Sequence, residues 1–391
     1  MKILYISGSK FPSEVSHTLS KMRMCQAFAD ADHEVMLLGM RSEQHEVDPM
    51  QYYGLRGGFQ VRLWKPTFPL SVPCRYSRVM SKLAFASHVR RVLHEVNPDL
   101  VYSRLTTTEL LFVPSSIPII FEMHSLGPLG KSRLQRWWFR KLFARKKVDR
   151  VVVTTNVLVN LLAEQLPGCK TTLARLSAEP PLAISDEDQA AFNEEYRKAE
   201  GFRSHVGYTG YLDTIGLRGT DIICRVAAQM PEVAFHIVGG EKSVVEHWQD
   251  FARAYNVNGN IFFYGHRNPS EIPLFLGSFD VVLAPLQYRP SARAPIGANM
   301  SPLKLPQYMA YRKAIIASDI PAHREILKDG NNALLVQCDD TGAWVAAINK
   351  LLSDPLLRER IGDAGHQAYL REYTPAGRVR SVLKGLDSGH G

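Results

Sequence analysis

The chain has few cysteines, no long apolar run and no low-complexity tract. Its 391 residues include five cysteines without C-x-x-C spacing, so neither a zinc site nor a disulfide framework is indicated. No stretch approaches the ~18 uninterrupted apolar residues of a membrane-spanning helix, and the opening apolar run is too short for a signal peptide. We therefore expect a cytoplasmic protein with reduced thiols. The cysteines are Cys25, Cys74, Cys169, Cys224 and Cys338.

Two cofactor signatures are also missing. The first predicted strand, residues 2–7, runs into Gly8 without the G-x-G-x-x-G fingerprint, which argues against a dinucleotide site there. No cluster of His and Cys indicates a metal site. We expect neither a cofactor nor a metal.

The composition is that of a globular protein with an acidic partner. Charged residues make up 22% and hydrophobic residues 45% of a chain long enough for two domains. The formal net charge of +9 favours a membrane surface, a nucleic acid or a phosphorylated substrate. Charge alone does not choose among these partners.

Short apolar runs alternate with helical patterns along the whole chain. This alternation predicts α/β folding, with parallel sheets covered by helices on both faces. The first half has predicted strands at 2–7, 33–39, 61–65, 99–103, 118–123, 149–155 and 171–175. The second half has them at 203–212, 233–241, 260–267, 280–287, 314–318 and 332–337.

The predicted organisation has two domains and a connector. We assign 1–184 to an N-terminal domain and 203–374 to a C-terminal domain. The acidic, helix-favouring residues 185–202 read as the connector. The apolar stripe of the tail 375–391 predicts a last helix that packs back on the N-terminal domain.

The segment 300–327 carries the clearest site pattern. Ser301 and Pro302 suit a helix start, and Lys304 adds positive charge to the amino end of that helix, as a diphosphate would require. Leu303, Tyr308 and the adjacent Met309 are expected in the core. The β-branched residues 314–318 then predict a buried parallel strand.

This segment, SPLKL-x-x-YMA-x-x-KAIIASD, resembles the family-4 glycosyltransferases of group 1 type, which have the GT-B fold. The resemblance implies two Rossmann-like domains facing a central cleft, with 1–184 as the acceptor-side domain and 203–374 as the nucleotide-sugar-binding domain. It also implies a hexosyltransferase-type enzyme (EC 2.4) that retains the anomeric configuration and needs no metal. The implied partners are a nucleotide-sugar donor and a glycan or lipid-linked acceptor.

Three residues match catalytic positions of that family. His124 ends the strand 118–123, where a single histidine would otherwise read as a turn cap. The resemblance instead places it against the donor sugar, while Glu122 reads as structural. Arg218 and Lys304 match the basic residues that hold the donor diphosphate, and Tyr211 stands where the family has another basic residue.

The resemblance also implies a set of donor-binding residues. Asn299 and Gln307 occupy the positions of the family's usual pair of glutamates, and Gln307 can still accept a hydrogen bond from a ribose hydroxyl. The His266–Arg267 turn is expected near the base. The donor-binding set is Gly8, Gly210, Tyr211, Gly239, Gly265, His266, Arg267, Asn299, Ser301, Leu305 and Gln307.

The segment 131–147 is basic and rich in aromatic residues, without an acidic residue. One interpretation is an interfacial helix on an anionic membrane or acceptor; another is an ordinary sheet-covering helix with solvated charges. Nucleic acid is a third partner, but no binding module accompanies the patch and we expect none. The surface residues assigned to this helix are Arg133, Arg136, Trp137, Trp138 and Arg140.

Two rival functions remain. A noncatalytic subunit of the same fold would bind a nucleotide or a partner without turnover, which the amides at 299 and 307 would fit. A sugar-nucleotide epimerase of GT-B fold would convert the donor without an acceptor.

Overall fold

The computed structural model describes most of the chain, as two compact units. Unit 1 comprises Met1–Arg175 and Pro375–Gly391, and unit 2 comprises Leu176–Thr374. The description excludes residues 14–15, 44–46, 66–73, 105–109, 111–112, 125–133, 135–136, 138, 142–147, 182–183, 197–198, 258, 269, 288–302 and 387–391, and the side chains of 16, 74–82, 188 and 195.

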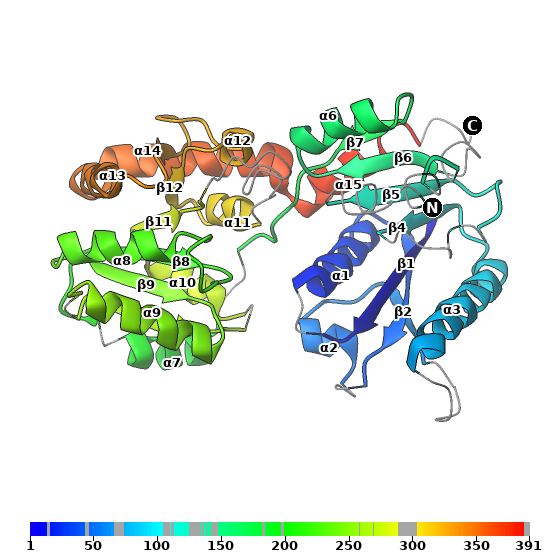
Figure 1. The fold of residues 1–391 in the computed structure, drawn as a ribbon, viewed down its shortest axis with the longest axis horizontal. Coiled ribbons are helices and arrows are strands. Elements are labelled where there is room, and N and C mark those ends of the chain that lie inside the picture. Colours follow the sequence, from blue (N-terminus) through cyan, green and yellow to red (C-terminus); the bar gives the residue numbers. More distant parts are fainter. Residues whose placement is uncertain are drawn as a thin grey trace. The chain divides into compact units, whose positions relative to one another are not determined.

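Unit 1 contains a seven-stranded parallel sheet in the order β3-β2-β1-β4-β5-β6-β7 (Figure 1). The strand order reverses between β1 and β4, and this switch point is where open α/β sheets bind ligands at their carboxyl edge. The strands are β1 Lys2–Phe11, β2 Glu34–Arg41, β3 Gln60–Trp64, β4 Leu100–Ser103, β5 Ile119–Met123, β6 Val148–Val153 and β7 Thr171–Leu173.

Helices cover both faces of this sheet because alternate strand residues point to opposite sides. Leu4 and Ile6 of β1 join a core built with α3 (Cys74–Val96) and α6 (Asn156–Gln165). Ile3 and Tyr5 join the opposite core, with α1 (Ser16–Ala29) and the last helix, α15 (Pro375–Leu383). The sheet is therefore buried on both sides, as the continuous apolar strands predict.

Unit 2 repeats the design with six parallel strands in the order β10-β9-β8-β11-β12-β13. Its switch point lies between β8 and β11. The strands are β8 His205–Thr209, β9 Ala234–Val238, β10 Ile261–Gly265, β11 Val281–Ala284, β12 Ala314–Ser318 and β13 Leu334–Val336. Figure 1 shows α8 and α9 in green beside β8 and β9.

The helices of unit 2 also form two layers. One core gathers α8, α9 and α13 on one face of the sheet, and the other gathers α7, α10 and α11 on the opposite face. The helices are α7 Asp186–Tyr196, α8 Thr220–Gln229, α9 Lys242–Ala254, α10 Ile272–Ser278, α11 Lys304–Ala310, α12 Pro321–Arg324, α13 Thr341–Ser353 and α14 Pro355–Ala368, followed by the π-helix η3 Tyr369–Tyr373.

The predicted strands are all present, but β1 is longer than expected. It continues through Gly8 to Phe11, because Lys10 and Phe11 resume pairing with β2 after an irregularity beyond Ile6. Gly8 therefore lies within a bulged strand, not in a loop after it. The short helix α2 (Pro49–Tyr53) and the helices α12 and α14 had not been expected in detail.

The segment expected to be a connector is part of unit 2. Helix α7 packs Phe192 edge-on against Phe275 at a centroid distance of 4.9 Å and stacks Tyr196 on His236 at 4.7 Å. These aromatic contacts explain why an acidic helix belongs to a folded unit. The chain leaves unit 1 after Arg175, earlier than the boundary predicted at 184.

Helix α15 belongs to unit 1 although it lies at the other end of the sequence. It buries Val379, Val382 and Leu383 in the core that contains β1 and α1. Among the described residues, no helix combines the length and hydropathy that a membrane crossing requires.

Candidate active site

The carboxyl edge of the unit 2 sheet is held together at its switch point by Tyr308 of α11. Its hydroxyl accepts a hydrogen bond from the backbone N–H of Thr209 at 2.9 Å. It also lies 3.5 Å from the carbonyl oxygen of Leu283, on β11. One buried side chain thus joins the ends of β8 and β11 to the helix that begins at Lys304.

The loop after β8 is shaped by one carboxylate. Asp213 accepts hydrogen bonds from the backbone N–H groups of Ile215, Leu217 and Arg218, at 2.9–3.0 Å. Trp248 of α9 donates to the carbonyl oxygen of Asp213 at 2.8 Å. This loop leads to Gly219, the left-handed residue before α8, and presents Arg218 at a fixed point.

Three predicted glycines meet beside that loop. The backbone of Gly210 bonds to Val238 at 2.9 Å, and Gly239 bonds to Gly265 at 2.8 Å. A Cβ atom on Gly239 would lie 1.9 Å from the carbonyl oxygen of Gly210. The strand ends therefore approach as closely as they do only because these positions lack side chains.

Lys304 lies over this backbone platform. Its Nζ atom is 3.6 Å from the centroid of the Tyr208 ring, and a Cβ on Gly210 would lie 3.2 Å from that Nζ. Burial and the positive charge of Arg218 lower the pKa of Lys304 well below its usual value. An anion at this point would relieve both effects.

Arg218 is the second cation of this edge. Its guanidinium carbon lies 5.7 Å from the centroid of the Tyr211 ring, and its Nε is buried without a hydrogen-bond partner. Within the described part of the chain, neither Arg218 nor Lys304 forms an ion pair with a carboxylate. Two neighbouring cations without a counter-ion among the described residues have the charge that a doubly charged anion would match.

The other predicted donor-binding residues are placed as follows. Gln307 is half-buried on α11, and His266 is exposed at the end of β10. Arg267 is engaged by the Tyr264 carbonyl oxygen at 3.1 Å. Leu305 and Met309 lie in the core, whereas Leu303, which we expected there, is 44% exposed, because it precedes the first turn of α11. Asn299, Ser301 and Pro302 lie outside the described residues.

In unit 1, His124 follows β5 and contacts a buried carboxylate. Its Nε2 atom bonds to Glu122, which also accepts hydrogen bonds from Tyr102 of β4 and Arg378 of α15. Burial alone would raise the pKa of Glu122, but Arg378 and His124 outweigh it and hold that pKa well below its usual value. Glu122 is thus an ionised partner of His124.

Sequence reasoning missed Lys21 at the same edge of unit 1. It is 5% exposed and donates to the hydroxyls of Ser7, at 3.1 Å, and Ser9, at 2.5 Å, on either side of Gly8. Burial, followed by the charge of Arg104, lowers the pKa of Lys21 to about 8. Lys21 was not singled out from the sequence, because the pattern of its helix shows only the spacing of the apolar residues.

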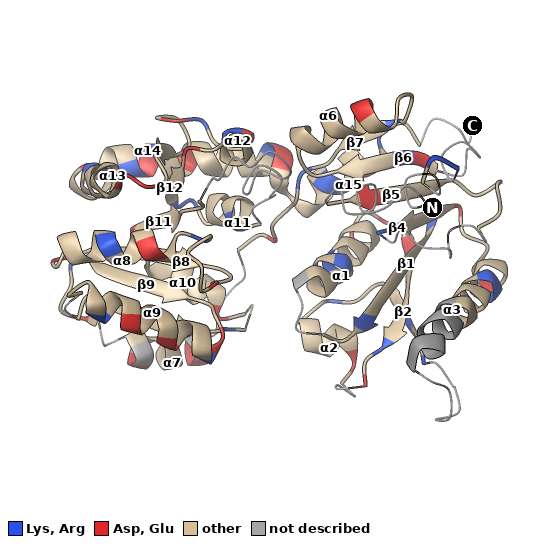
Figure 2. Ribbon diagram, viewed as in Figure 1, with Lys and Arg blue, Asp and Glu red and all other residues tan. Residues whose placement is uncertain are grey.

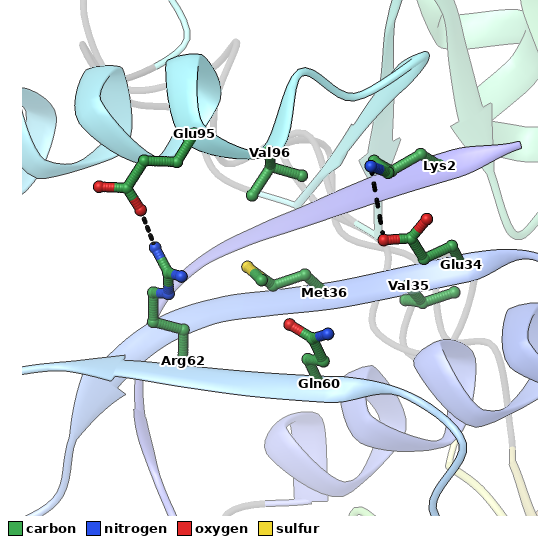
Figure 3. A pocket seen from close by; sticks show the side chains of 8 residues that line it. All are labelled: Lys2, Glu34, Val35, Met36, Gln60, Arg62, Glu95 and Val96. Atoms are coloured by element: carbon green, nitrogen blue, oxygen red, sulfur yellow. Dashed lines mark hydrogen bonds and ion pairs between the residues drawn. The ribbon is translucent and has the colours of Figure 1, made fainter.

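A pocket of about 190 Å³ lies at the opposite edge of the unit 1 sheet. The residues that begin β1, β2 and β3 line it, and the ion pairs Lys2–Glu34 and Arg62–Glu95 border it (Figure 3). Ligands of parallel sheets bind at the carboxyl edge instead. This pocket is therefore not the candidate site.

The basic segment 131–147 is described only in part. Phe139 is buried and packs against Phe121 of β5 at a centroid distance of 5.4 Å. Leu134 and Trp137 are 65% and 51% exposed, and Lys141 lies 5.6 Å from the centre of the Trp137 ring. Arg140 is exposed. Arg133, Arg136 and Trp138 lie outside the described residues.

Comparisons with known proteins agree with this geometry. Residues 193–368 match the family model of glycosyl transferases group 1, and residues 22–173 match that of glycosyltransferase family 4. The chain belongs to the GT-B glycosyltransferases of group 1 and family 4.

Curated relatives match over limited segments. The chain is 29% identical over 135 residues to a putative glycosyltransferase, EpsD, of Bacillus subtilis, covering 34% of this chain and 32% of that protein. It is equally similar to a phosphatidyl-myo-inositol mannosyltransferase of Mycolicibacterium smegmatis, covering 34% and 31%. The chain thus matches about a third of the length of each relative.

Solved structures match over the full length. Anabaena HepE in complex with UDP and glucose has a TM-score of 0.70 at 18% identity, with 99% of this chain and 100% of that chain covered. A glycosyltransferase from Rickettsia africae has a TM-score of 0.75 at 12% identity, with 98% and 99% covered. This likeness establishes the fold.

Proposed function

We propose that this protein is a retaining glycosyltransferase that moves a hexose from a nucleotide-sugar donor to a glycan or lipid-linked acceptor. The observation that carries the proposal is the pair of cations Lys304 and Arg218 at the switch point of the unit 2 sheet, which has no counter-ion in the part of the chain that the structure describes. A nucleoside diphosphate supplies two adjacent negative phosphates, which match this pair. The UDP that HepE binds supports the same donor class.

The chemistry needs charge at the leaving group more than it needs a nucleophile. As the bond between the anomeric carbon and the diphosphate breaks, negative charge grows on the phosphate oxygen, and Lys304 and Arg218 stabilise it. The acceptor oxygen attacks on the same face, and its proton passes to the departing phosphate. This route retains the configuration and assigns no step to a metal or a cofactor.

His124 is proposed to form a hydrogen bond with a substrate hydroxyl. Gln307, half-buried on α11, is proposed to accept a hydrogen bond from the donor ribose. Asn299 and Ser301 keep their proposed roles beside the donor, as does the glycine platform formed by the backbone of Gly210, Gly239 and Gly265.

One measurement tests the class directly. The purified protein is incubated with a panel of sugar nucleotides and candidate acceptors, with and without EDTA, and products are identified by mass spectrometry. We expect transfer that survives EDTA, with an unchanged anomeric configuration by NMR. Inversion or loss of transfer with EDTA would contradict the mechanism, and product formation from donor alone would favour an epimerase.

Nucleotide binding, measured beside sugar transfer, distinguishes an enzyme from a noncatalytic subunit. Titration calorimetry with UDP, GDP, ADP and TDP is expected to find one of them bound, with affinity lost in Lys304→Ala. Binding of none of them favours a scaffold. Binding without transfer to any acceptor favours a noncatalytic nucleotide-binding protein.

We further propose that the protein acts peripherally on the cytoplasmic side of a membrane, in polysaccharide or envelope-lipid synthesis. The exposed Leu134 and Trp137 beside Lys141 and Arg140 support this, because aromatic and basic groups together favour an anionic lipid interface. We expect sedimentation with anionic liposomes that weakens at high salt and in Trp137→Ser. Leu356→Ser, at a 78% exposed leucine of unit 2, is the control, and equal binding by both variants would contradict the assignment.

A further inference from the structure

Glu122 is a buried carboxylate held by side chains from three elements. Arg378 of α15 donates to it at 2.6 Å, and Tyr102 and His124 bond to it as well. The side chains of Glu122 and Arg378 are each only 4% exposed. Burying such a pair costs several kcal/mol per ion in desolvation. An apolar pair of similar volume would avoid this cost.

The bond to Glu122 fixes which nitrogen of His124 carries the proton. An ionised carboxylate only accepts hydrogen bonds, so Nε2 of His124 must donate. Burial lowers the pKa of His124 even though Glu122 opposes the shift, so the ring is neutral near pH 7. A neutral ring has one N–H, which leaves Nδ1 as an acceptor. The ring is 21% exposed and forms no other hydrogen bond with the described residues.

We propose that Glu122 and Arg378 are positioning residues, which together hold His124 as a neutral ring with its acceptor nitrogen, Nδ1, turned to a substrate hydroxyl. This inference rests on the proposed function in assigning a substrate to His124. The tautomer and protonation state of the His124 ring can be measured without any activity.

Arg378 is needed because it supplies the positive charge that His124 would otherwise supply. With Arg378 absent, the nearest partner for the Glu122 carboxylate is the imidazole, which would take up a proton and turn Nδ1 into a donor. Two further cations bear on this group: Arg104, after β4, acts on His124 and Glu122, and Lys21 of α1 interacts with Glu122. Neither Arg104 nor Lys21 donates a hydrogen bond to Glu122.

The guanidinium of Arg378 also reaches the backbone. It donates to the carbonyl oxygens of Ala174 and Arg175, which follow β7. Only arginine has enough N–H donors in a fixed fork to hold two carbonyls and a carboxylate at once. The guanidinium that binds Glu122 is thereby itself held in place from a second side.

A merely structural ion pair would give a different result. It would anchor α15 and affect stability, but neither the tautomer nor the pKa of His124 would depend on it. The positioning role predicts that Arg378→Met raises the pKa of His124, because the imidazole becomes the counter-ion. It predicts that Glu122→Gln lowers that pKa and lets the amide donate to Nε2, which moves the proton to Nδ1.

The experiment is nitrogen NMR of the full chain labelled with 15N-histidine, titrated from pH 5 to 9, with His124→Gln used to assign the signal. In the natural protein we expect a neutral ring with Nε2–H. We expect shifts of about one to three pH units in opposite directions for Arg378→Met and Glu122→Gln. Arg378→Lys is included in case the Met variant fails to fold, with a smaller upward shift expected.

The matched control is Arg380→Met, because Arg380 is exposed on the same helix. We expect it to leave the tautomer and pKa of His124 unchanged. A natural protein with Nδ1–H, or variants at 122 and 378 that leave the ring unaffected, would overturn the proposal. These readouts are independent of whether the protein transfers sugar.

Where transfer is measurable, kinetics test the substrate part. We expect Glu122→Gln to lower kcat by about 10- to 100-fold, the size typical of losing a residue that orients a functional histidine, with a smaller change in KM. In a His124→Ala background the same substitution should have little further effect. Full additivity of the two losses would show that Glu122 does not act through His124.

Discussion

The carboxyl edges of the two sheets differ in whether their cationic side chains are paired with a carboxylate. In unit 1, a buried carboxylate, Glu122, faces Arg378 and His124, and every member of the group has a partner. In unit 2, Lys304 and Arg218 lie together, and among the described residues neither forms an ion pair with a carboxylate, since Asp213 accepts from the backbone N–H of Arg218 and not from its guanidinium. Figure 2 shows an acidic position on β5 and a basic one on α15 in unit 1. The first edge is suited to neutral hydroxyls and the second to an anion.

The largest expected effect comes from removing charge at the unit 2 edge. Lys304→Ala should lower kcat/KM for sugar transfer by about 10²- to 10³-fold, because it removes a preorganised cation from the leaving group. Lys328→Ala, at an exposed lysine of the same unit, is the control. Steady-state kinetics on both variants measure the difference, and equal activities would remove Lys304 from the site.

In unit 2 the backbone of Gly239 closely approaches that of Gly210, whereas the histidine group of unit 1 is held by side chains. Gly239→Ala should destabilise unit 2 by roughly 2–4 kcal/mol, from positive φ and the clash with Gly210. Gly259 also has a positive φ, of +76°, but open space around it, so Gly259→Ala is expected to cost only about 1 kcal/mol. Chemical denaturation followed by circular dichroism compares the two.

The pH dependence of nucleotide affinity tests whether the unit 2 cation is titratable. Lys304 has a lowered pKa and a diphosphate favours its charged form, so binding takes up a proton once pH exceeds that pKa. Affinity for the nucleoside diphosphate should fall as pH rises, by at most about tenfold per unit. Calorimetry between pH 7 and 9.5 measures it. Lys304→Met should bind more weakly and without this slope.

Acid should weaken unit 2 before unit 1. Burial, with a contribution from His205, lowers the pKa of His236 to about 3, whereas an unfolded histidine titrates near 6.5. The unfolded state therefore binds more protons between these values, and stability falls as pH drops, by at most about 1.4 kcal/mol per unit. In unit 1, burial also lowers the pKa of His124, but Glu122 opposes that shift, and the pKa of Glu122 itself is held well below its usual value, so we expect a smaller loss of stability there over the same range.

Hydrogen exchange followed by mass spectrometry at pH 7 and pH 5 resolves the two units. His236→Gln should flatten the slope in unit 2, while His247→Gln, at an exposed residue of α9, should not. Equal acid sensitivity of the units, or an earlier loss in unit 1, would contradict the comparison.

Much of the fold could be predicted because apolar strands and helix periodicity are local features. Residues 314–318 form the predicted buried strand, and Tyr308 and Met309 lie in the core. Leu303 was wrongly placed because, within the described residues, α11 begins at Lys304, two residues after the start at Pro302 that the Ser-Pro pattern indicates. Gly8 was misread because β1 resumes pairing after a bulge, which depends on β2.

Lys304 and Arg218 could be singled out because they lie in recognisable motifs, and the structure brings them together; their role at a donor site stays a prediction. The other partners of Glu122 were not found, because Tyr102 and Arg378 come from distant parts of the chain. Strand alternation correctly places Glu122 opposite its immediate neighbours, and therefore on the same side as His124, two residues later. That Arg378, 256 residues away, completes the group follows only from the packing of α15.

The return of α15 makes unit 1 a discontinuous domain. A fragment ending at Arg175 would lack the apolar residues that cover α1 and β1, and would leave the Glu122 carboxylate buried without its guanidinium. Arg150 would also lose its bond to the carbonyl oxygen of Lys384. Unit 2, in contrast, is one uninterrupted stretch. Expression of isolated halves should therefore succeed for 176–374, and for 1–175 only when the terminal helix is fused or added in trans.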